Sequence, residues 1–173
     1  MKKRTAIRLG VLLLVTIALV SAWALVSAAN GQLATVTTNS TATYNHIGIA
    51  TVGGNLECDA PITLHIYGTL QQPVGRKDSV VGSFASDFSC GPGSPTGWSA
   101  LVVPTAGKFA GGSAILTGTY SGYARVNMGW DYPSYTPYPN CDGPYYDYSS
   151  GWFFQCYVNG GFGPQTVKLT NSK

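Results

Sequence analysis

Residues 62–71 read ITLHIYGTLQ, and the alternation of apolar and polar side chains along this stretch decides the fold class. In an extended chain, one face carries four apolar side chains, those of Ile62, Leu64, Ile66 and Leu70. The opposite face carries Thr63, His65, Tyr67 and Thr69. A period of two residues with a single apolar face predicts a half-buried antiparallel strand.

A second long alternation occupies residues 113–128. Its apolar face holds Ala114, Leu116, Tyr120, Ala124, Val126 and Met128. Ile115 and Tyr123 are apolar exceptions on the polar face. Gly118 and Gly122 leave gaps in the pattern and predict a bend or a bulge in this strand.

Shorter strands are predicted between clusters of turn-forming residues, at residues 35–44, 47–58, 79–90, 98–103, 152–158 and 166–170. A bulge is expected at Gly53-Gly54, and turns are expected at residues 72–78 and 160–164. In the 79–90 strand, the side chains available for the core are Val81, Phe84 and Phe88. Many short strands separated by turns are typical of a sandwich or a barrel.

The N-terminal segment has the features of a secretory signal peptide. Four basic residues, Lys2, Lys3, Arg4 and Arg8, precede an apolar run at residues 9–26, and small residues follow it at 27–29. We therefore expect a helical signal peptide over residues 1–29 and a single domain over residues 30–173. The alternative is an uncleaved membrane anchor, because an apolar run of about 18 residues is at the lower limit for spanning a bilayer.

Removal of this leader changes the charge of the protein. The whole chain has 10 basic and 7 acidic residues, and four of the basic ones lie in the leader. The remaining domain is close to neutral, so a nucleic-acid partner, which requires a basic face on the folded domain, is not expected. No cofactor is expected either, and membrane contact would come only through an uncleaved leader.

All four cysteines, Cys58, Cys90, Cys141 and Cys156, lie in the expected mature domain. An even number of cysteines in an exported chain predicts two disulfides. Three pairings are possible, and we favour Cys58 with Cys90 and Cys141 with Cys156, because each cysteine then joins its nearest neighbour in sequence. A zinc site is the alternative, although the spacing contains no C-x2-C pair.

Four short features stand out: residues 54–58 (GNLEC), the alternating strand that ends at Gln71, the Cys90 loop followed by Trp98, and residues 109–114 (FAGGSA). Together they resemble a group of small exported bacterial proteins with an immunoglobulin-like β-sandwich. The resemblance covers about residues 35–123 and implies a Cys58–Cys90 bridge and a location outside the cytoplasm, but no activity. We therefore expect an all-β, antiparallel immunoglobulin-like β-sandwich of about seven to nine strands. A true antibody domain is not expected, since such domains place a tryptophan between the bridged cysteines.

Residues 130–158 are rich in aromatic and proline residues. Because proline removes hydrogen-bond donors from a sheet, we expect a long Tyr/Pro-rich loop pinned by Cys141 and Cys156, returning through a hairpin. Tyrosine and tryptophan offer broad, stiff, amphipathic contact surfaces that suit binding sites. The candidate binding residues are Trp130, Tyr132, Tyr135, Tyr138, Tyr145, Tyr146 and Tyr148. The alternative is that these rings cover the core of the domain itself.

Candidate catalytic groups are few. Glu57, the only glutamate, could pair with Asp59 or Asp87 as the acid and base of a glycosidase. His46 and His65 lie on different predicted elements, and the sequence has no G-x-S-x-G motif, so a serine-hydrolase triad is not indicated. Three carboxylates in the aromatic segment could hold calcium, although their spacing is not that of an EF-hand: Asp131, Asp142 and Asp147.

The sequence thus predicts a secreted or extracytoplasmic, non-enzymatic domain. It would bind a protein or a glycan at the cell exterior through its aromatic segment. Two alternatives stay open, namely a structural component of the envelope or of an extracellular appendage, and a secreted hydrolase that uses a carboxylate pair.

Overall fold

The structure is a computed structural model that describes residues 32–75 and 78–172. The expected signal peptide, residues 1–29, lies outside the described residues. The chain divides into two units, Met1–Gln32 and Leu33–Lys173, and the fold is that of the second unit.

Strands make up 71% of the described residues, which contain no helix, so the all-β class is confirmed. The nine strands are β1 (Ala34–Thr38), β2 (Thr41–Tyr44), β3 (Ala50–Cys58), β4 (Ile62–Val74), β5 (Asp78–Cys90), β6 (Thr96–Pro104), β7 (Gly112–Gly129), β8 (Cys141–Asp147) and β9 (Gly151–Asn171).

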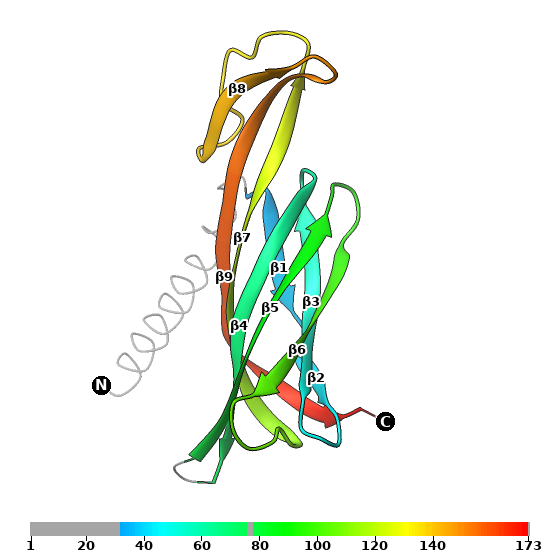
Figure 1. Cartoon of the computed structure of the whole chain (residues 1–173), viewed down its shortest axis with the longest axis vertical. Helices are drawn as coiled ribbons and strands as arrows, with labels where there is room; N and C mark the ends of the chain where they lie inside the picture. Colours follow the sequence, from blue (N-terminus) through cyan, green and yellow to red (C-terminus); the bar gives the residue numbers. More distant parts are fainter. Residues whose placement is uncertain (1–31, 76–77, 173) are drawn as a thin grey trace, which may run out of the picture. The chain divides into compact units, whose positions relative to one another are not determined.

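Seven of these strands close into a barrel, in the order β3-β2-β9-β7-β4-β5-β6, with β6 returning to β3 (Figure 1). Strand β1 pairs with residues 54–58 of β3, next to the part of β3 that pairs with β2. Strand β8 pairs with β9. Strand β2 runs parallel to β9, whereas the other pairs of neighbours are antiparallel.

The immunoglobulin-like β-sandwich expected from the sequence is therefore wrong. A sandwich has two sheets that face each other, whereas here one sheet curls until β3 and β6 pair from Ala50–Val102 to Leu56–Thr96. Sandwiches and barrels both need strands with one inward and one outward face. The alternation in the sequence therefore could not distinguish between them.

The two alternations that anchored the sequence prediction are confirmed. In β4, four apolar side chains are buried, those of Ile62, Leu64, Ile66 and Leu70, and the residues between them are largely exposed. In β7, Ala114, Leu116, Tyr120 and Ala124 are buried, while Ile115 and Tyr123 are exposed as expected. These inward faces line the barrel core together with Phe154, Val167 and Leu169 of β9.

Trp98 fills the interior where β5 and β6 diverge. These two strands pair only through Gly82–Pro104 and Ser83–Val103. The indole of Trp98 is buried, with Phe84, Phe88 and Phe162 around it at ring-centre distances of 6.2, 6.0 and 5.7 Å. Aromatic side chains thus close the part of the barrel that backbone hydrogen bonds leave open.

The expected bulge at Gly53-Gly54 is wrong, because β3 keeps an unbroken register with both of its neighbours there. The glycine at 54 is required for a different reason. A Cβ at this position would lie 1.8 Å from the Thr37 carbonyl oxygen. That same oxygen accepts a hydrogen bond from Trp98 Nε1 at 2.9 Å, so the glycine lets the indole reach β1.

The turn expected at residues 72–78 is present but shorter, because β4 continues to Val74 and β5 begins at Asp78. Two other local expectations are wrong. Val80 rather than Val81 is buried in β5. Strand β9 continues through the expected 160–164 turn, where the register with β7 shifts between Leu116 and Gly118. Proline at position 164 lacks an amide hydrogen, and a bulge accommodates that loss without ending the strand.

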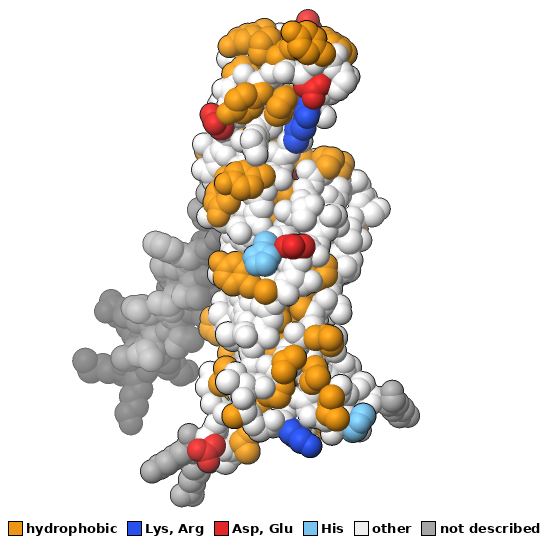
Figure 2. All heavy atoms as spheres, viewed as in Figure 1, with side chains coloured by type: hydrophobic (Ala, Val, Ile, Leu, Met, Phe, Trp, Pro, Cys, Tyr) orange, Lys and Arg blue, Asp and Glu red, His pale blue; other side chains and the backbone are white. Residues whose placement is uncertain are grey.

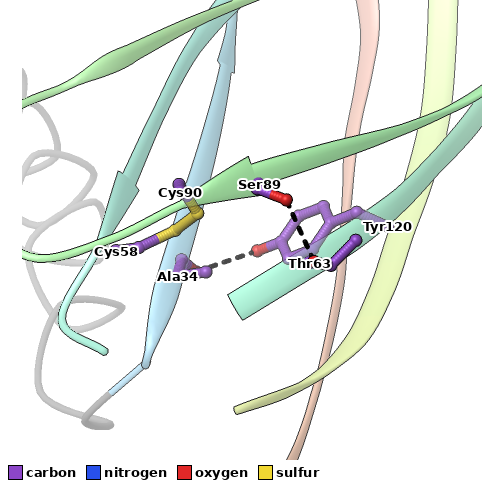
Figure 3. Close-up of a disulfide and its surroundings, with 6 residues drawn as sticks. All are labelled: Ala34, Cys58, Thr63, Ser89, Cys90 and Tyr120. Atoms are coloured by element: carbon purple, nitrogen blue, oxygen red, sulfur yellow. Dashed lines mark hydrogen bonds between the residues drawn. A yellow bond between two sulfur atoms is a disulfide. The ribbon is translucent and has the colours of Figure 1, made fainter. Parts of the chain in front are cut away.

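Both favoured disulfide pairings are present. Cys58 is bonded to Cys90 across a Cα distance of 5.9 Å, which ties the end of β3 to the end of β5. Figure 3 shows the buried Tyr120 near this bridge, with its hydroxyl donating to the Ala34 carbonyl at 3.3 Å. Burial raises the pKa of the Tyr120 hydroxyl. The second bridge joins Cys141 to Cys156, which are direct cross-strand partners in β8 and β9.

Candidate binding surface

The aromatic segment forms a three-stranded extension of the barrel wall. Strand β4 begins at Ile62, opposite Ala124 of β7, so beyond Ala124 the paired partner of β7 among the described residues is β9. Strand β8 pairs with the other edge of β9 through residues 141–147. Figure 1 shows β7, β8 and β9 continuing together past the ends of the other strands. We call residues 124–158 the arm.

The expectation of a continuous loop over residues 130–151 is wrong, because part of this range forms strand β8. The loop spans residues 130–140, and Cys141–Asp147 is an edge strand with a register shift between Asp142 and Tyr145. Proline is tolerated on an edge strand at a bulge, which explains Pro144 in this position. The turn to β9 is short and ends at Gly151, whose φ of 80° suits a glycine.

Direct cross-strand partners point to the same face of a sheet, so the register assigns each ring of the arm to one of two faces. On the face that continues the exterior of the barrel, Tyr123 pairs with Tyr157 and Phe153 pairs with Tyr145. Arg125 and Gln155 pair with each other between these two levels. We call this face the outer strip, and it consists of Tyr123, Arg125, Asn127, Asp142, Tyr145, Phe153, Gln155 and Tyr157.

Three of the four rings of the outer strip are exposed, those of Tyr123, Tyr145 and Tyr157, whereas Phe153 is partly buried. Tyr123 is 61% exposed and Tyr157 is 41% exposed, and their ring centres are 5.2 Å apart. Tyr145 lies beside Phe153 with 5.6 Å between ring centres. Figure 2 shows that apolar side chains on this side of the domain gather in separate groups, with polar side chains between them.

Arg125 is held on the strip by a stacking contact and by hydrogen bonds to Asn127, Asp147 and Ser150. Its guanidinium carbon lies 3.8 Å from the centre of the Phe153 ring, and its Nη2 donates to Asp147 Oδ2 at 2.9 Å. Asp147 Oδ1 accepts from the Ser149 hydroxyl at 2.6 Å and from the Ser149 amide at 2.8 Å. The bonds from Ser149, together with Arg125, hold the pKa of the Asp147 carboxyl well below its usual range.

Asp142 is bonded to a tyrosine instead of a cation. The Tyr145 hydroxyl donates to Asp142 Oδ2 at 2.5 Å, and the Gly143 amide donates to Asp142 Oδ1 at 3.0 Å. The hydrogen bond to Asp142 raises the pKa of the Tyr145 hydroxyl, because loss of the phenol proton would leave two negative groups together. At neutral pH, this bond fixes the orientation of the Tyr145 ring.

The opposite face of the arm has its own aromatic cluster, centred on Trp152. The ring centres of Tyr132 and Tyr146 are 4.9 and 5.0 Å from that of Trp152, and both pairs are edge-to-face. Tyr148 extends the cluster to the turn between β8 and β9, at 5.4 Å from Tyr146, and is 92% exposed. We call these four residues the Trp152 cluster.

The structure therefore divides the seven candidate binding residues among several places. Tyr145 lies on the outer strip, whereas Tyr132, Tyr146 and Tyr148 belong to the Trp152 cluster. Two residues of the 130–140 loop, Trp130 and Tyr135, are exposed. Tyr138 is partly buried and packs against the core.

Sequence reasoning missed several residues of the outer strip, namely Tyr123, Arg125, Phe153 and Tyr157. The signal for Tyr123 was present, since this ring interrupts the polar face of an otherwise alternating strand. Its cross-strand partner Tyr157 is 34 positions away in sequence and could be identified only from the register of β7 and β9.

One candidate carboxylate pair comes together at a pocket. Glu57 and Asp59 line a pocket of about 310 Å³ with Cys58 and the loop residues Gly93, Ser94 and Pro95. Asp87 lies elsewhere, on the exterior of β5, where its Oδ1 is 2.7 Å from His65 Nδ1. Glu57 therefore lies at the same pocket as Asp59, whereas Asp87 is hydrogen-bonded to His65.

The three carboxylates considered for calcium do not converge. Within residues 32–75 and 78–172, no group of three or more acidic, histidine or cysteine side chains has the geometry to hold a metal ion. Asp147 is engaged by Arg125, and Asp142 is engaged by Tyr145. The same stretches contain no helix with the length and hydrophobicity needed to cross a membrane.

Comparisons with protein-family models, curated proteins and solved structures find no match to this chain.

Proposed function

We propose that this protein is an exported, non-enzymatic binding domain whose arm contacts a partner at the cell exterior. The observation that carries the proposal is the concentration of exposed tyrosine and tryptophan rings on an extension of the barrel wall. Eight exposed rings lie in the arm or next to it: Tyr123, Trp130, Tyr132, Tyr135, Tyr145, Tyr146, Tyr148 and Tyr157. Exposed aromatic groups on this scale are typical of interaction surfaces.

Several contacts restrain the side chains and strands of the arm, which supports the same proposal. A binding surface gains affinity when its side chains are already held in place, because less conformational entropy is lost on binding. The Cys141–Cys156 bridge, the Arg125–Asp147 ion pair and the Tyr145–Asp142 hydrogen bond each restrain a part of the arm.

The location outside the cytoplasm rests on two features. Two disulfides are typical of a protein that folds in an oxidising compartment. The signal-peptide pattern of residues 1–29 adds the route of export. We propose that the domain is secreted or held on the outer side of the membrane.

The proposal can be tested by sedimentation of the purified exported protein with the intact cells that produce it. The arm variant carries Tyr123→Ser, Tyr135→Ser, Tyr145→Ser and Tyr148→Ser. The control variant carries Leu101→Ser and Val103→Ser, two exposed positions of β6. We expect the cells to bind the wild type and the control equally and the arm variant at least several-fold less. Equal binding of all three proteins, or no binding of the wild type, would overturn the proposal.

A secreted hydrolase is the second candidate, because Glu57 and Asp59 share a pocket. A glycosidase typically uses two carboxylates beside a cleft, one as the acid and one as the base or nucleophile. The test is release of reducing sugar from soluble polysaccharides by the wild type and by Glu57→Gln. Release that Glu57→Gln abolishes would establish the hydrolase and remove the non-enzymatic proposal.

A further inference from the structure

We infer that the outer strip binds an uncharged polysaccharide, along the direction of β7 and β9. The inference rests on the proposed function, since it assigns a ligand class to one face of the arm. Three properties of the strip carry it: the kind of polar group between the rings, the internal bonds of its charged groups, and the spacing of its rings.

The polar groups of the strip and of the barrel face below it are mainly hydroxyls and amides. Moving from the arm towards the barrel, the cross-strand partners on this face are Asn127–Phe153, Arg125–Gln155, Tyr123–Tyr157, Ser121–Asn159 and Thr119–Gly161. None of these ten positions is occupied by an aliphatic side chain. Protein interfaces have an apolar centre, whereas a sugar presents hydroxyl groups around a ring with weakly polar faces. This strip offers partners for both parts of a sugar.

The charged groups of this face already form bonds within the protein. Arg125 is bonded to Asp147 at 2.9 Å and stacked on Phe153 at 3.8 Å. His65 lies 2.7 Å from Asp87 on the neighbouring strands. Asp142 accepts from the Tyr145 hydroxyl. A charged ligand would have to compete with these internal bonds, whereas an uncharged one would not.

The spacing of the rings fits a chain of sugars better than a single small molecule. Tyr157 and Phe153 are four residues apart on β9, which corresponds to roughly 13 Å along a strand. Tyr123 shares the first of these levels, and Tyr145 shares the second. Gln155 and Arg125 lie between the two levels. The strip therefore offers the open Tyr123–Tyr157 pair at one level and the Tyr145 ring at the other, where Arg125 covers the Phe153 ring, with hydrogen-bonding groups between the two levels.

The alternative ligand for this face is an extended protein segment. It would bind mainly through backbone groups at a strand edge, but the outer strip is a face of the sheet and its β7 and β9 strands are hydrogen-bonded to each other throughout the arm. A protein ligand on this face would have to pack against the aromatic rings and polar groups alone, because the paired positions of β7 and β9 there carry no aliphatic side chain. The observations favour the polysaccharide.

The test is affinity electrophoresis of the exported protein in native gels that contain one soluble polysaccharide each. The uncharged probes are laminarin, hydroxyethylcellulose, xylan, galactomannan and dextran, and the charged probe is alginate. Sedimentation with cellulose and with chitin extends the test to insoluble uncharged polymers. The variants are Tyr123→Ala, Tyr157→Ala and the double variant, with Leu101→Ala at an exposed position of β6, outside the arm, as the control. Tyr123→Phe and Tyr157→Phe keep the ring and remove only the hydroxyl.

We expect at least one uncharged polysaccharide to bind the wild type, with an affinity that changes little between low and high salt. Each alanine variant should bind about tenfold more weakly, since it loses one stacking ring. The Leu101→Ala control should bind like the wild type, and the phenylalanine variants, which keep the ring, should bind more tightly than the alanine variants. Circular dichroism of every variant checks that the fold is retained, as expected for exposed side chains.

Three results would overturn the inference: binding to alginate alone, undiminished binding by the double alanine variant, or no binding to any of these polymers. The proposed function can fail separately. If no polysaccharide binds but the arm variant still loses its attachment to cells, the proposed function stands and the ligand class is wrong. If the cells do not bind the wild type either, both are wrong.

Discussion

The guanidinium of Arg125 lies 3.8 Å from the centre of the Phe153 ring and donates to Asp147, so one cation connects β7, β8 and β9 on the exterior of the arm. Planar stacking and a directed hydrogen bond together suit arginine rather than lysine. These two contacts order the outer strip, and the Asp147 carboxylate neutralises the positive charge of Arg125.

The first prediction concerns the pH dependence of the Asp147 contacts. The folded-state pKa of Asp147 is lowered, so its carboxylate stabilises the fold above its unfolded pKa of about 3.9, and this contribution is lost as the pH falls through the folded value. Asp147→Asn should therefore lower the Tm at neutral pH and have a progressively smaller effect in acid. Thermal unfolding of both proteins over a pH series measures this. A Tm difference that grows in acid would contradict the assignment.

The second prediction concerns the Tyr145 hydroxyl. Its pKa is raised by the hydrogen bond to Asp142, so the bond stabilises the fold below the unfolded pKa of about 10 and is lost as the pH rises through the folded value. In Asp142→Asn, Tyr145 should titrate at a lower pH than in the wild type. NMR of ring-labelled tyrosine follows this single group. Unchanged titration of Tyr145 would show that the bond does not form in solution.

The third prediction concerns the buried amide of Gln72, which is 4% exposed. Its Nε2 donates to the Ala110 carbonyl at 2.8 Å, and its Oε1 accepts from the Ala110 amide at 2.9 Å. Gln72→Ala leaves both backbone groups without a partner and should cost about 2 kcal/mol in the free energy of unfolding. The neighbouring exposed Gln71→Ala is the matched control and should cost far less. Equal effects in urea unfolding would contradict this role.

The fourth prediction separates the two disulfides. Loss of Cys58–Cys90 by paired alanine substitution should destabilise the whole barrel by roughly 3 to 4 kcal/mol, because it releases a closed loop of 32 residues. Loss of Cys141–Cys156 should act mainly on β8, since that bridge joins β8 to β9 at the base of the arm. Hydrogen exchange should then show faster exchange in β8 with unchanged protection in β4. Loss of protection throughout the barrel would contradict this division.

The parts of the fold that depend on short-range pattern were predictable from the sequence. The inward faces of β4 and β7 follow from a period of two, and the nearest-neighbour disulfide pairing is present. Strand β8 was not predicted, because Pro144 and Gly143 interrupt its alternation and an edge strand tolerates them. The closure of the barrel depends on pairings between distant segments, such as β2 with β9, which no local pattern encodes.

The candidate binding surface was predictable as a region but not as a face. The aromatic composition of residues 130–158 predicts that the binding surface lies in this region of the chain. Which rings lie together depends on register, and the bulge between Asp142 and Tyr145 changes the phase of β8. Tyr145 and Tyr146 were both candidate binding residues, and because they are adjacent in β8 the structure places them on opposite faces of the arm.

Radical footprinting of the protein on the cells that produce it tests the central claim most directly. Oxidation of each aromatic side chain is compared by mass spectrometry between the free and the cell-bound protein. We predict that Tyr123, Tyr145 and Tyr157 become protected on binding, while Leu101 and Val103 of β6 stay as reactive as in the free protein. Protection of Leu101 and Val103 with unchanged oxidation of the three tyrosines would contradict the claim that the arm is the binding surface.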